Sequence, residues 1–223
     1  MMTIQPFVAE REWTVEGVPV LSASVSVPQP SPAEDRTARR LRRYYQLQCR
    51  AYLRYCEKLL LPQAEAEYRA ALAASAPLPA FRAELRYTIT YEDHRFLSLY
   101  TQSREVTLPG QTFLTRRGDT WDLAAGYPVS LWDLLPRRSG RRQMLELAAR
   151  QIQIQEQAGM ARYRPDWRRQ LRRRFNPQNY YLTEEGLVFF YPMYAIAPAA
   201  EGVPAFLLPY GESLPSPRQD SRA

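Results

Sequence analysis

The sequence is poor in lysine, histidine and cysteine, and these shortages exclude several kinds of site. Lys58 is the single lysine among 30 basic residues in a chain of 223, and His94 is the single histidine. A zinc site of the hydrolase type that needs two histidines therefore cannot form. Neither a G-x-x-x-x-G-K-[ST] loop nor a G-x-G-x-x-G loop occurs in the chain, so two common nucleotide-binding motifs are missing as well.

The remaining candidates for catalysis are few. A Ser-His-Asp set would have to use His94, which follows Glu92 and Asp93 in a predicted turn. A solvated loop histidine is the preferred interpretation of that position. Adjacent acids such as Glu184 and Glu185 lie in another predicted turn, where solvation accounts for them. We therefore expect no enzymatic activity, no metal and no cofactor.

The two cysteines and the hydropathy pattern predict a compartment. Cys49 and Cys56 are seven residues apart on a predicted helix, about 10 Å along its axis. Disulfide Cα atoms normally lie within about 7 Å of each other, so the pair cannot bridge within one helix. We expect both thiols to be buried in a reducing environment. The sequence has no apolar run long enough to span a membrane and no recognisable signal peptide, which predicts a cytoplasmic location.

The net charge of +7 is unevenly distributed. Residues 36–58 carry a net +7 and residues 137–174 carry a net +9, so the rest of the chain is −9. Nearly all of these bases are arginines, whose guanidinium groups suit carboxylates, phosphates and aromatic faces. The basic character therefore belongs to two segments, both of which have helical periodicity.

The N-terminal half predicts strands around one long helix. Leu21, Ala23, Val25 and Val27 alternate with serines, as expected for a strand with one buried face. A weaker strand precedes it, with a bend at Gly17. From residue 36 to about residue 74, apolar residues recur every three or four positions, which predicts a helix. Its expected N-cap is Asp35, and Pro62 should kink the helix or end its first half.

The C-terminal half predicts hairpins, then helices, then two final strands. Alternation in residues 81–91 indicates a long, half-exposed strand. Later strands follow, with a turn predicted at Gly118. A helix is expected after "RRSG", with a buried stripe of Leu145, Ala148 and Ile152 and an end at Gly159. A shorter helix in "RPDWRRQLRRRF" has Pro165 and Asp166 in its first turn and an anchoring face of Trp167, Leu171 and Phe175.

Three motifs in the last hundred residues carry a family resemblance. They are "GYPVSLWDL" at 126–134, "FFYPMYAIAP" at 189–198 followed by Gly202, and "LPY" at 208–210. Their order from about residue 96 to residue 210 resembles the C-terminal domain of RsiV-type anti-sigma factors, which also accompanies peptidoglycan deacetylases of the PdaC type. The resemblance comes without the catalytic, sigma-binding or transmembrane parts. Members of that family are typically extracytoplasmic, whereas this sequence by itself predicts a cytoplasmic protein.

Pattern and resemblance together predict an α+β fold. We expect a twisted antiparallel β-sheet with a long N-terminal helix and a C-terminal helical pair packed on one face. Residues 1–210 are expected to form a single α+β domain. Within it, residues 1–95 hold the N-terminal strands, the long helix and the first sheet strand, and residues 96–210 form the RsiV-like part. The polar segment 211–223 is expected to be a disordered tail.

Two functions remain open. The resemblance implies a noncatalytic recognition module that binds a protein or a cell-envelope-related ligand through its sheet or its basic helices. Lysozyme, which anti-sigma relatives bind, is itself basic, so an acidic partner suits this chain better. The alternative is a nucleic-acid-binding protein that uses the arginine-rich helices 36–58 and 162–174.

The candidate contact residues come from two segments. In the helix they are Arg168, Arg169, Arg172 and Arg173. In the aromatic-proline segment they are Tyr191, Met193 and Tyr194. The aromatics of this segment are mainly expected in the core, because strands bury their aromatic residues. Alternatively, a bulge next to Pro192 would turn Tyr191 and Tyr194 outward as a contact patch.

Overall fold

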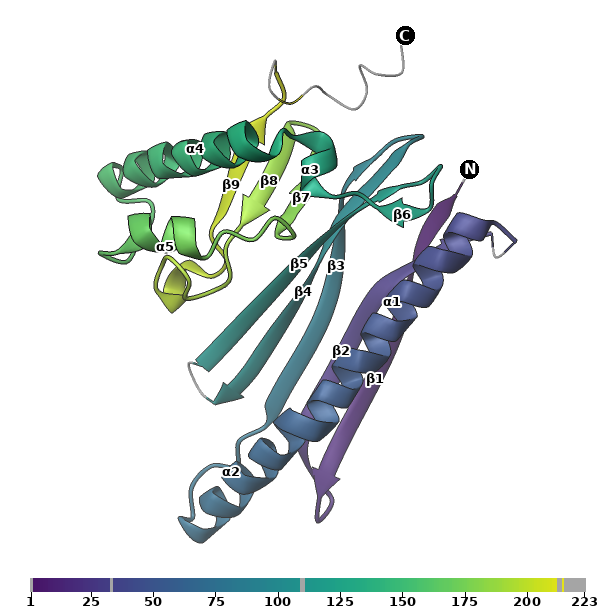
Figure 1. Ribbon diagram of the computed structural model, residues 1–223. Coiled ribbons are helices and arrows are strands. Elements are labelled where there is room, and N and C mark those ends of the chain that lie inside the picture. The colour runs from purple at the N-terminus through teal and green to yellow at the C-terminus, as the bar shows by residue number, and fades with distance from the viewer. Residues whose placement is uncertain (1, 33, 109–110, 212–213, 215–223) are drawn as a thin grey trace. The chain divides into compact units, whose positions relative to one another are not determined.

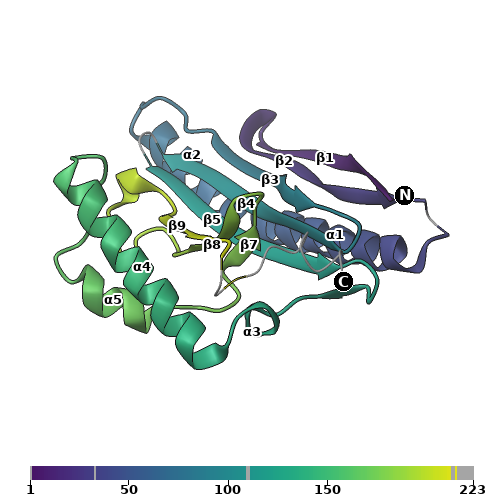
Figure 2. The same cartoon turned by 90° about the horizontal axis from the view of Figure 1, so that it is seen from above.

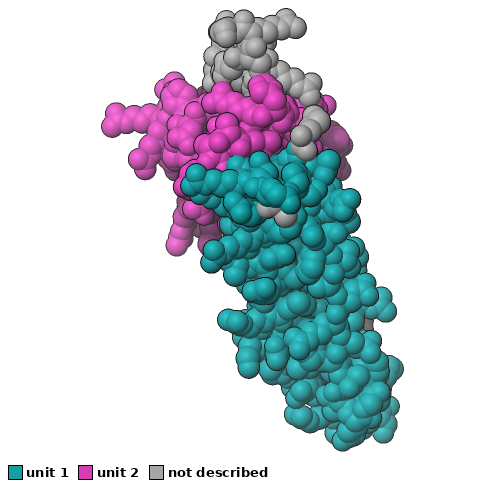
Figure 3. Space-filling view, turned by 90° about the vertical axis from the view of Figure 1, so that its right-hand side faces the viewer, with its two compact units in different colours: residues 1–87, 101–114 teal, residues 88–100, 115–223 magenta. Residues whose placement is uncertain are grey.

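The computed structural model describes residues 2–32, 34–108, 111–211 and 214. The chain folds into two compact units, shown in two colours in Figure 3. Unit 1 contains residues 1–87 and 101–114, and unit 2 contains residues 88–100 and 115–223. The division between the units crosses three long strands, so each of these strands contributes residues to both units. The single domain of residues 1–210 stays a prediction.

The α+β class is confirmed, with six strands in a first sheet of order β1-β2-β3-β4-β5-β6 (Figure 1). The strands are β1 (Thr3–Val15), β2 (Val18–Ser31), β3 (Phe81–Glu92), β4 (Phe96–Leu108), β5 (Gln111–Asp122) and β6 (Tyr127–Pro128). Strands β1 and β2 pair antiparallel across the predicted bend, where Gly17 has a φ of +80°. A positive φ is readily adopted only by a residue without a Cβ, which explains glycine at the bend.

One pairing in the first sheet departs from the predicted antiparallel arrangement. Strands β2 and β3 are parallel, with Leu21 opposite Phe81 and Val25 opposite Leu85. The helical segment 36–73 joins them and returns the chain to the same end of the sheet. Parallel neighbours require such a long crossover, whereas a tight turn produces antiparallel neighbours.

Unit 1 buries the alternating face of β2 against helix α1 (Arg36–Tyr55). Residues Leu21, Ala23, Val25 and Val27 are all buried, as their alternation predicted. The N-cap prediction is also confirmed, because the Asp35 side chain accepts a 2.6 Å hydrogen bond from the backbone N–H of Ala38. Such a cap satisfies one of the free amides in the first turn of a helix.

Pro62 marks the start of the second half of the helix, as predicted. Helix α1 ends at Tyr55, and the chain continues through a π-helical turn, η1 (Cys56–Leu60), into α2 (Leu61–Ala73), with Pro62 in the first turn of α2. In this turn the N–H of Leu61 donates to the carbonyl of Cys56, five residues earlier. A proline inside an α-helix clashes with the carbonyl four residues before it. The wider π-turn precedes Pro62 directly and is the local adjustment with which the helix accommodates that ring.

Unit 2 contains a second sheet that the sequence analysis did not include. Its order is β7-β8-β9, formed by β7 (Tyr180–Leu182), β8 (Gly186–Phe190) and β9 (Ala205–Pro209). The helices of this unit are α3 (Leu131–Leu134), α4 (Arg137–Gln157) and α5 (Trp167–Arg173). The core joins apolar residues of α4 and α5 to those of the second sheet, including Met144, Ile152, Leu171, Phe189 and Phe206.

Gly118 is not in a turn, so that prediction is wrong. It lies within β5, and the backbone of β7 at Tyr180 passes directly over it. A Cβ at this position would lie 2.7 Å from the carbonyl carbon of Tyr180 and closer still to its oxygen. Glycine is therefore required here for a close backbone approach and not for an unusual backbone angle.

Two further boundaries differ from the predictions. Helix α4 begins at Arg137, within "RRSG" and not after it, and ends before Gly159 with its φ of +65°, as expected. At the C-terminus, Gly211 and Leu214 form an isolated β-bridge, and Leu214 is 3% exposed in the core of unit 2. The rest of the predicted disordered tail lies outside the described residues.

Candidate functional site

A groove of about 710 Å³ lies between helices α4 and α5 of unit 2. Figures 1 and 2 show these two helices side by side. The groove is lined by Arg137, Arg138, Arg141, Arg142, Leu145, Glu146, Ala149, Trp167, Arg168, Leu171 and Arg172. Six of these eleven residues are arginines, which carry a positive charge, and one is a glutamate, which carries a negative charge. The groove therefore combines a dense positive charge with an apolar floor.

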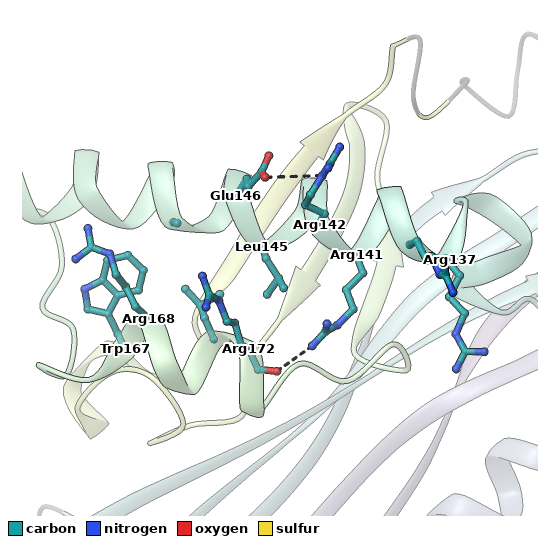
Figure 4. Close-up of a pocket in the computed structure, with 11 residues that line it drawn as sticks. Arg137, Arg141, Arg142, Leu145, Glu146, Trp167, Arg168 and Arg172 are labelled. Carbon is teal, nitrogen blue, oxygen red and sulfur yellow. Dashed lines mark hydrogen bonds and ion pairs between the residues drawn. The ribbon is translucent and has the colours of Figure 1, made fainter.

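The floor exists because α4 presents two apolar faces. Met144, Ala148 and Ile152 are buried in the core of unit 2. Met144 takes the buried position that the sequence analysis assigned to Leu145. Leu145 is instead half-buried and projects toward α5, as Figure 4 shows. The spacing of four residues places Ala149 on the same face as Leu145.

Helix α5 completes the floor and supplies two arginines. Trp167 and Leu171 are 5% and 2% exposed and anchor the short helix to the core. Arg168 directly follows Trp167, and Arg172 directly follows Leu171. The two arginines are four residues apart, so they share one face of the helix, and both line the groove. The guanidinium carbon of Arg168 lies 4.6 Å from the centroid of the Trp167 ring, so it covers part of that ring.

Only two of the four arginines predicted on this helix lie in the groove. Arg169 forms an ion pair of 2.9 Å with Asp166, which also accepts a hydrogen bond from Gln170. These hydrogen bonds and the nearby arginines lower the pKa of Asp166. Arg173 is exposed and lies outside the lining. The helical period separates the two pairs, because residues 169 and 173 fall on a different face from residues 168 and 172.

The two helices are antiparallel along the groove. The Arg141 side chain donates a 3.2 Å hydrogen bond to the backbone carbonyl of Arg172, at the C-terminal end of α5 (Figure 4). The guanidinium of Arg141 also lies 5.5 Å from the centroid of the Phe175 ring. Arg141 therefore connects the two helices through its side chain, and this contact shows that the start of α4 lies next to the end of α5.

The positive charge of the groove is weakly compensated. Glu146 pairs with Arg142 at 3.9 Å, but both side chains are mostly exposed, and exposed pairs contribute little to stability. Within the described ranges, no carboxylate lies within ion-pair distance of Arg137, Arg138 or Arg172. The first turn of α4 contains no acidic residue, and its macrodipole adds further positive potential there.

The aromatic-proline segment forms a turn after β8 and not a bulge within a strand. Tyr191 is 1% exposed, and its hydroxyl donates to the Leu171 carbonyl at 2.9 Å, so it belongs to the core and the outward patch is wrong for this residue. Met193 is 8% exposed and also mostly buried. Tyr194 is 48% exposed with a φ of +67°. Of these three candidates, only Tyr194 presents its ring at the surface.

Sequence reasoning missed most of the groove. It identified residues 137–174 as a basic segment, but it expected the helix to begin after residue 140 and so assigned no role to Arg137 or Arg138. The spacing of residues 137, 141, 145 and 149 places them on one helical face, and this pattern was visible in the sequence. What the sequence did not show was that α5 lies along that face.

The other ionisable candidates lie apart from the groove residues. His94 is exposed in the turn between β3 and β4. In the same turn, Asp93 accepts hydrogen bonds from the Tyr91 hydroxyl and from the backbone of Phe96. Burial raises the pKa of Asp93, but these hydrogen bonds outweigh it and the net pKa is lowered. Among the described residues, no group of three or more histidine, cysteine, aspartate or glutamate side chains has a metal-binding arrangement.

None of the helices in the described part of the chain combines the length and hydropathy needed to cross a membrane.

The observations so far define an α+β protein with two sheets and an arginine-lined groove between two helices. Residues 133–211 match the model of a family described as "Protein of unknown function (DUF3298)". This segment contains α4, α5 and the whole second sheet. All the residues that line the groove therefore lie inside the matched part.

Two solved structures have a similar fold. A crystal structure of a DUF3298 family member from Bacteroides fragilis NCTC 9343 has 14% sequence identity and a TM-score of 0.70, covering 96% of this chain and 94% of that one. A DUF3298 family protein from Pseudomonas aeruginosa PAO1 has 16% identity and a TM-score of 0.59, covering 94% and 91%. A search of curated proteins produced no match.

Proposed function

We propose that this protein is a noncatalytic recognition module that binds an acidic segment of a protein partner in the groove between α4 and α5. The observation that carries the proposal is the set of guanidinium groups of Arg137, Arg138 and Arg172, which have no carboxylate partner among the described residues and surround an apolar floor. The resemblance of residues 96–210 to RsiV-type domains supports a recognition role. The groove between α4 and α5 supports the proposal as the site of contact.

The chemistry of the lining favours a carboxylate-bearing ligand. A guanidinium group presents paired N–H donors that match a carboxylate bidentately, and such charge-assisted hydrogen bonds are stronger than neutral ones. The apolar floor of Leu145, Ala149 and Leu171 excludes water from one side of the groove. Charged contacts next to such a surface are less screened than contacts in bulk water. A protein segment that carries both acidic and apolar side chains satisfies both features.

The same lining supports a noncatalytic role. Among the residues that form it, Glu146 is the single group able to act as a general base, and it is exposed beside Arg142. General acid-base work requires a group whose pKa is tuned by burial or by close neighbours. A nucleophilic side chain next to a base is the other common requirement. Arginine, leucine, alanine and tryptophan bind ligands well and do not supply that chemistry.

Nucleic acid is the competing ligand class. Arginine-rich surfaces bind phosphates, but sequence-tolerant binding of single strands also relies on exposed aromatic faces on which bases stack. Trp167 is the single aromatic residue of the groove, is 5% exposed and is partly covered by Arg168. The groove therefore offers phosphate contacts without a stacking platform. This arrangement favours the acidic protein segment.

The proposal is tested by fluorescence anisotropy with a labelled synthetic peptide of glutamate and leucine residues and a labelled single-stranded oligonucleotide. The groove variant is R137A/R138A/R172A, which leaves the structural tie at Arg141 intact. The matched control is R36A/R39A/R43A, which removes the same charge from exposed positions on α1. We expect the groove variant to weaken peptide binding at least tenfold and the control to change it less than threefold.

Two results would contradict the proposal. Peptide binding that is absent at low salt, or that falls equally in both variants, would mean that the groove is not the site. Oligonucleotide binding that is tighter than peptide binding and depends on the groove arginines would replace the acidic protein with nucleic acid. Circular dichroism of each variant verifies that a loss of binding does not reflect unfolding.

A further inference from the structure

We infer that the groove binds a bipartite segment, in which a block of acidic side chains is adjacent along the chain to a block of apolar side chains. This inference rests on the proposed function and names the pattern that the partner must carry. It comes from the distribution of charge along the groove, which is uneven from one end to the other.

The cationic end is formed by the start of α4 and the end of α5. Arg137, Arg138, Arg141 and Arg142 occupy the first two turns of α4. The hydrogen bond from Arg141 to the carbonyl of Arg172 places the last turn of α5 beside them. Five of the six groove arginines therefore lie at this end. The positive end of the α4 macrodipole coincides with it and adds to the attraction for an anion.

The other end is apolar. Leu145 and Ala149 follow on α4 after the arginines, and Trp167 lies at the start of the antiparallel α5. The single arginine at this end, Arg168, lies over the Trp167 ring at 4.6 Å. Its aliphatic stem and guanidinium face cover an aromatic surface, which is how arginine packs against apolar partners. A ligand thus meets mainly hydrocarbon in this half of the groove.

Glu146 marks the border between the two halves. It is the single carboxylate of the lining and follows the arginine block on α4, and Figure 4 shows it paired with Arg142 at the edge of the groove, on the side of the helix away from Leu145. A ligand carboxylate that passes beyond the arginine block meets this like charge and loses the guanidinium partners. Repulsion of this kind is a common source of specificity between otherwise similar ligands.

The dimensions of the groove limit the length of the segment. The lining of α4 extends from Arg137 to Ala149, so it is about 18 Å long at 1.5 Å per residue. An extended peptide advances about 3.3 Å per residue, so roughly five or six residues fill the groove. We infer that two or three acidic residues occupy the cationic half and two or three apolar residues occupy the other half.

The test uses three labelled hexapeptides of identical composition, three glutamates and three leucines, added to the full chain. In two peptides the residues form blocks, in either order, and in the third they alternate. We expect one block peptide to bind at least tenfold more tightly than the alternating peptide. Because all three have the same net charge, non-specific attraction to the arginines contributes equally to each.

Three variants test which half of the groove binds the acidic block of the peptide and which half binds the apolar block. The R137A/R138A variant should bind the preferred block peptide at least tenfold more weakly than the original protein does. L145S should weaken it several-fold, but should not change binding of a peptide in which serine replaces each leucine. E146Q should tighten binding of the alternating peptide, because the like charge at the border is removed. R150Q, on the same helix and outside the lining, is the control for each of them.

The outcomes separate this inference from the function on which it rests. Equal binding of all three peptides, with loss in the groove variant, would overturn the bipartite pattern and leave acidic-segment recognition standing. Absence of binding by every peptide would overturn the proposed function itself. The comparison between peptides uses the unaltered protein, so it holds even where the L145S variant fails to fold.

Discussion

The hydroxyl of Tyr55 on helix α1 donates a 2.9 Å hydrogen bond to the carboxylate of Glu105 on strand β4. Glu105 is only 6% exposed, and burial raises its pKa, while hydrogen bonds from Tyr55 and Ser103 partly offset that rise. Burial and the nearby Glu105 raise the pKa of the Cys56 thiol to about 12. A buried acid thus lies close to the π-helical turn inside unit 1.

Replacing Glu105 with glutamine should change how stability depends on pH. A carboxyl group with a higher pKa in the folded state contributes stability that is fully present below its unfolded pKa and is lost as the pH rises through the folded pKa. Glutamine does not ionise, so the E105Q variant lacks this loss. We expect its free energy of unfolding, relative to the original protein, to rise as the pH increases from the unfolded pKa of glutamate, about 4.3, through the higher folded pKa of Glu105.

Urea denaturation followed by circular dichroism at several pH values measures this difference. E84Q is the control, since Glu84 lies on β3 and is more exposed than Glu105. A relative stability of E105Q that stays constant or falls with pH would contradict a raised pKa for Glu105.

Replacing Tyr55 with phenylalanine should destabilise the protein. The change removes the hydroxyl that donates to the buried Glu105, and an unsatisfied buried acceptor costs about 1–3 kcal/mol. The loss should be smaller in the E105Q background, where the acceptor is neutral. A double-mutant cycle on these two positions measures the interaction directly, and a coupling energy near zero would mean that the hydrogen bond contributes nothing.

The G118A variant should be strongly destabilised for a purely steric reason. The new methyl group would collide with the backbone carbonyl of Tyr180, and overpacking of this kind costs about 1–3 kcal/mol or more. Gly211 has open space at the corresponding position, so G211A is the matched control and should be nearly neutral. Equal midpoints of chemical denaturation for the two variants would contradict the close approach of β5 and β7.

Arg116 should stabilise unit 2 through aromatic contacts. Its guanidinium carbon lies 4.4 Å from the Tyr100 ring centroid and 5.9 Å from that of Phe190. Cation–π contacts at partly buried sites contribute about 1–2 kcal/mol, so R116M should lower the free energy of unfolding by a similar amount. R104M, at an exposed position of β4, should change it by less than about 0.5 kcal/mol.

Removing arginines from the start of α4 should stabilise the fold while it weakens ligand binding. Arg137 and Arg138 lie in the first turn, where the macrodipole is already positive and no acidic residue compensates. Each replacement by glutamine should raise the free energy of unfolding by about 0.3–1 kcal/mol at low salt. R150Q, further along the helix, should not. A gain in stability coupled to a loss of peptide binding would show that these arginines are kept for binding.

Local patterns were sufficient for much of the fold. The alternation of Leu21 and its neighbours, the cap at Asp35 and the helix end at Gly159 each depend on interactions within a few residues. The pattern of hydropathy and the preferred backbone angles of single residues therefore predicted them. The charge count likewise identified the basic segment that contains the groove, and one face of α4 could have been recognised by its spacing of four.

What only the tertiary structure decided are the relations between distant segments. Three such relations depend on which faces meet. They are the parallel pairing of β2 with β3, the approach of Tyr180 to Gly118, and the position of Arg168 and Arg172 in the groove while Arg169 and Arg173 lie outside it. The groove has the same origin, because α5 lies antiparallel to the arginine-bearing face of α4. Side-chain periodicity determines which residues share a face, but burial of apolar area over the whole unit determines which faces come together.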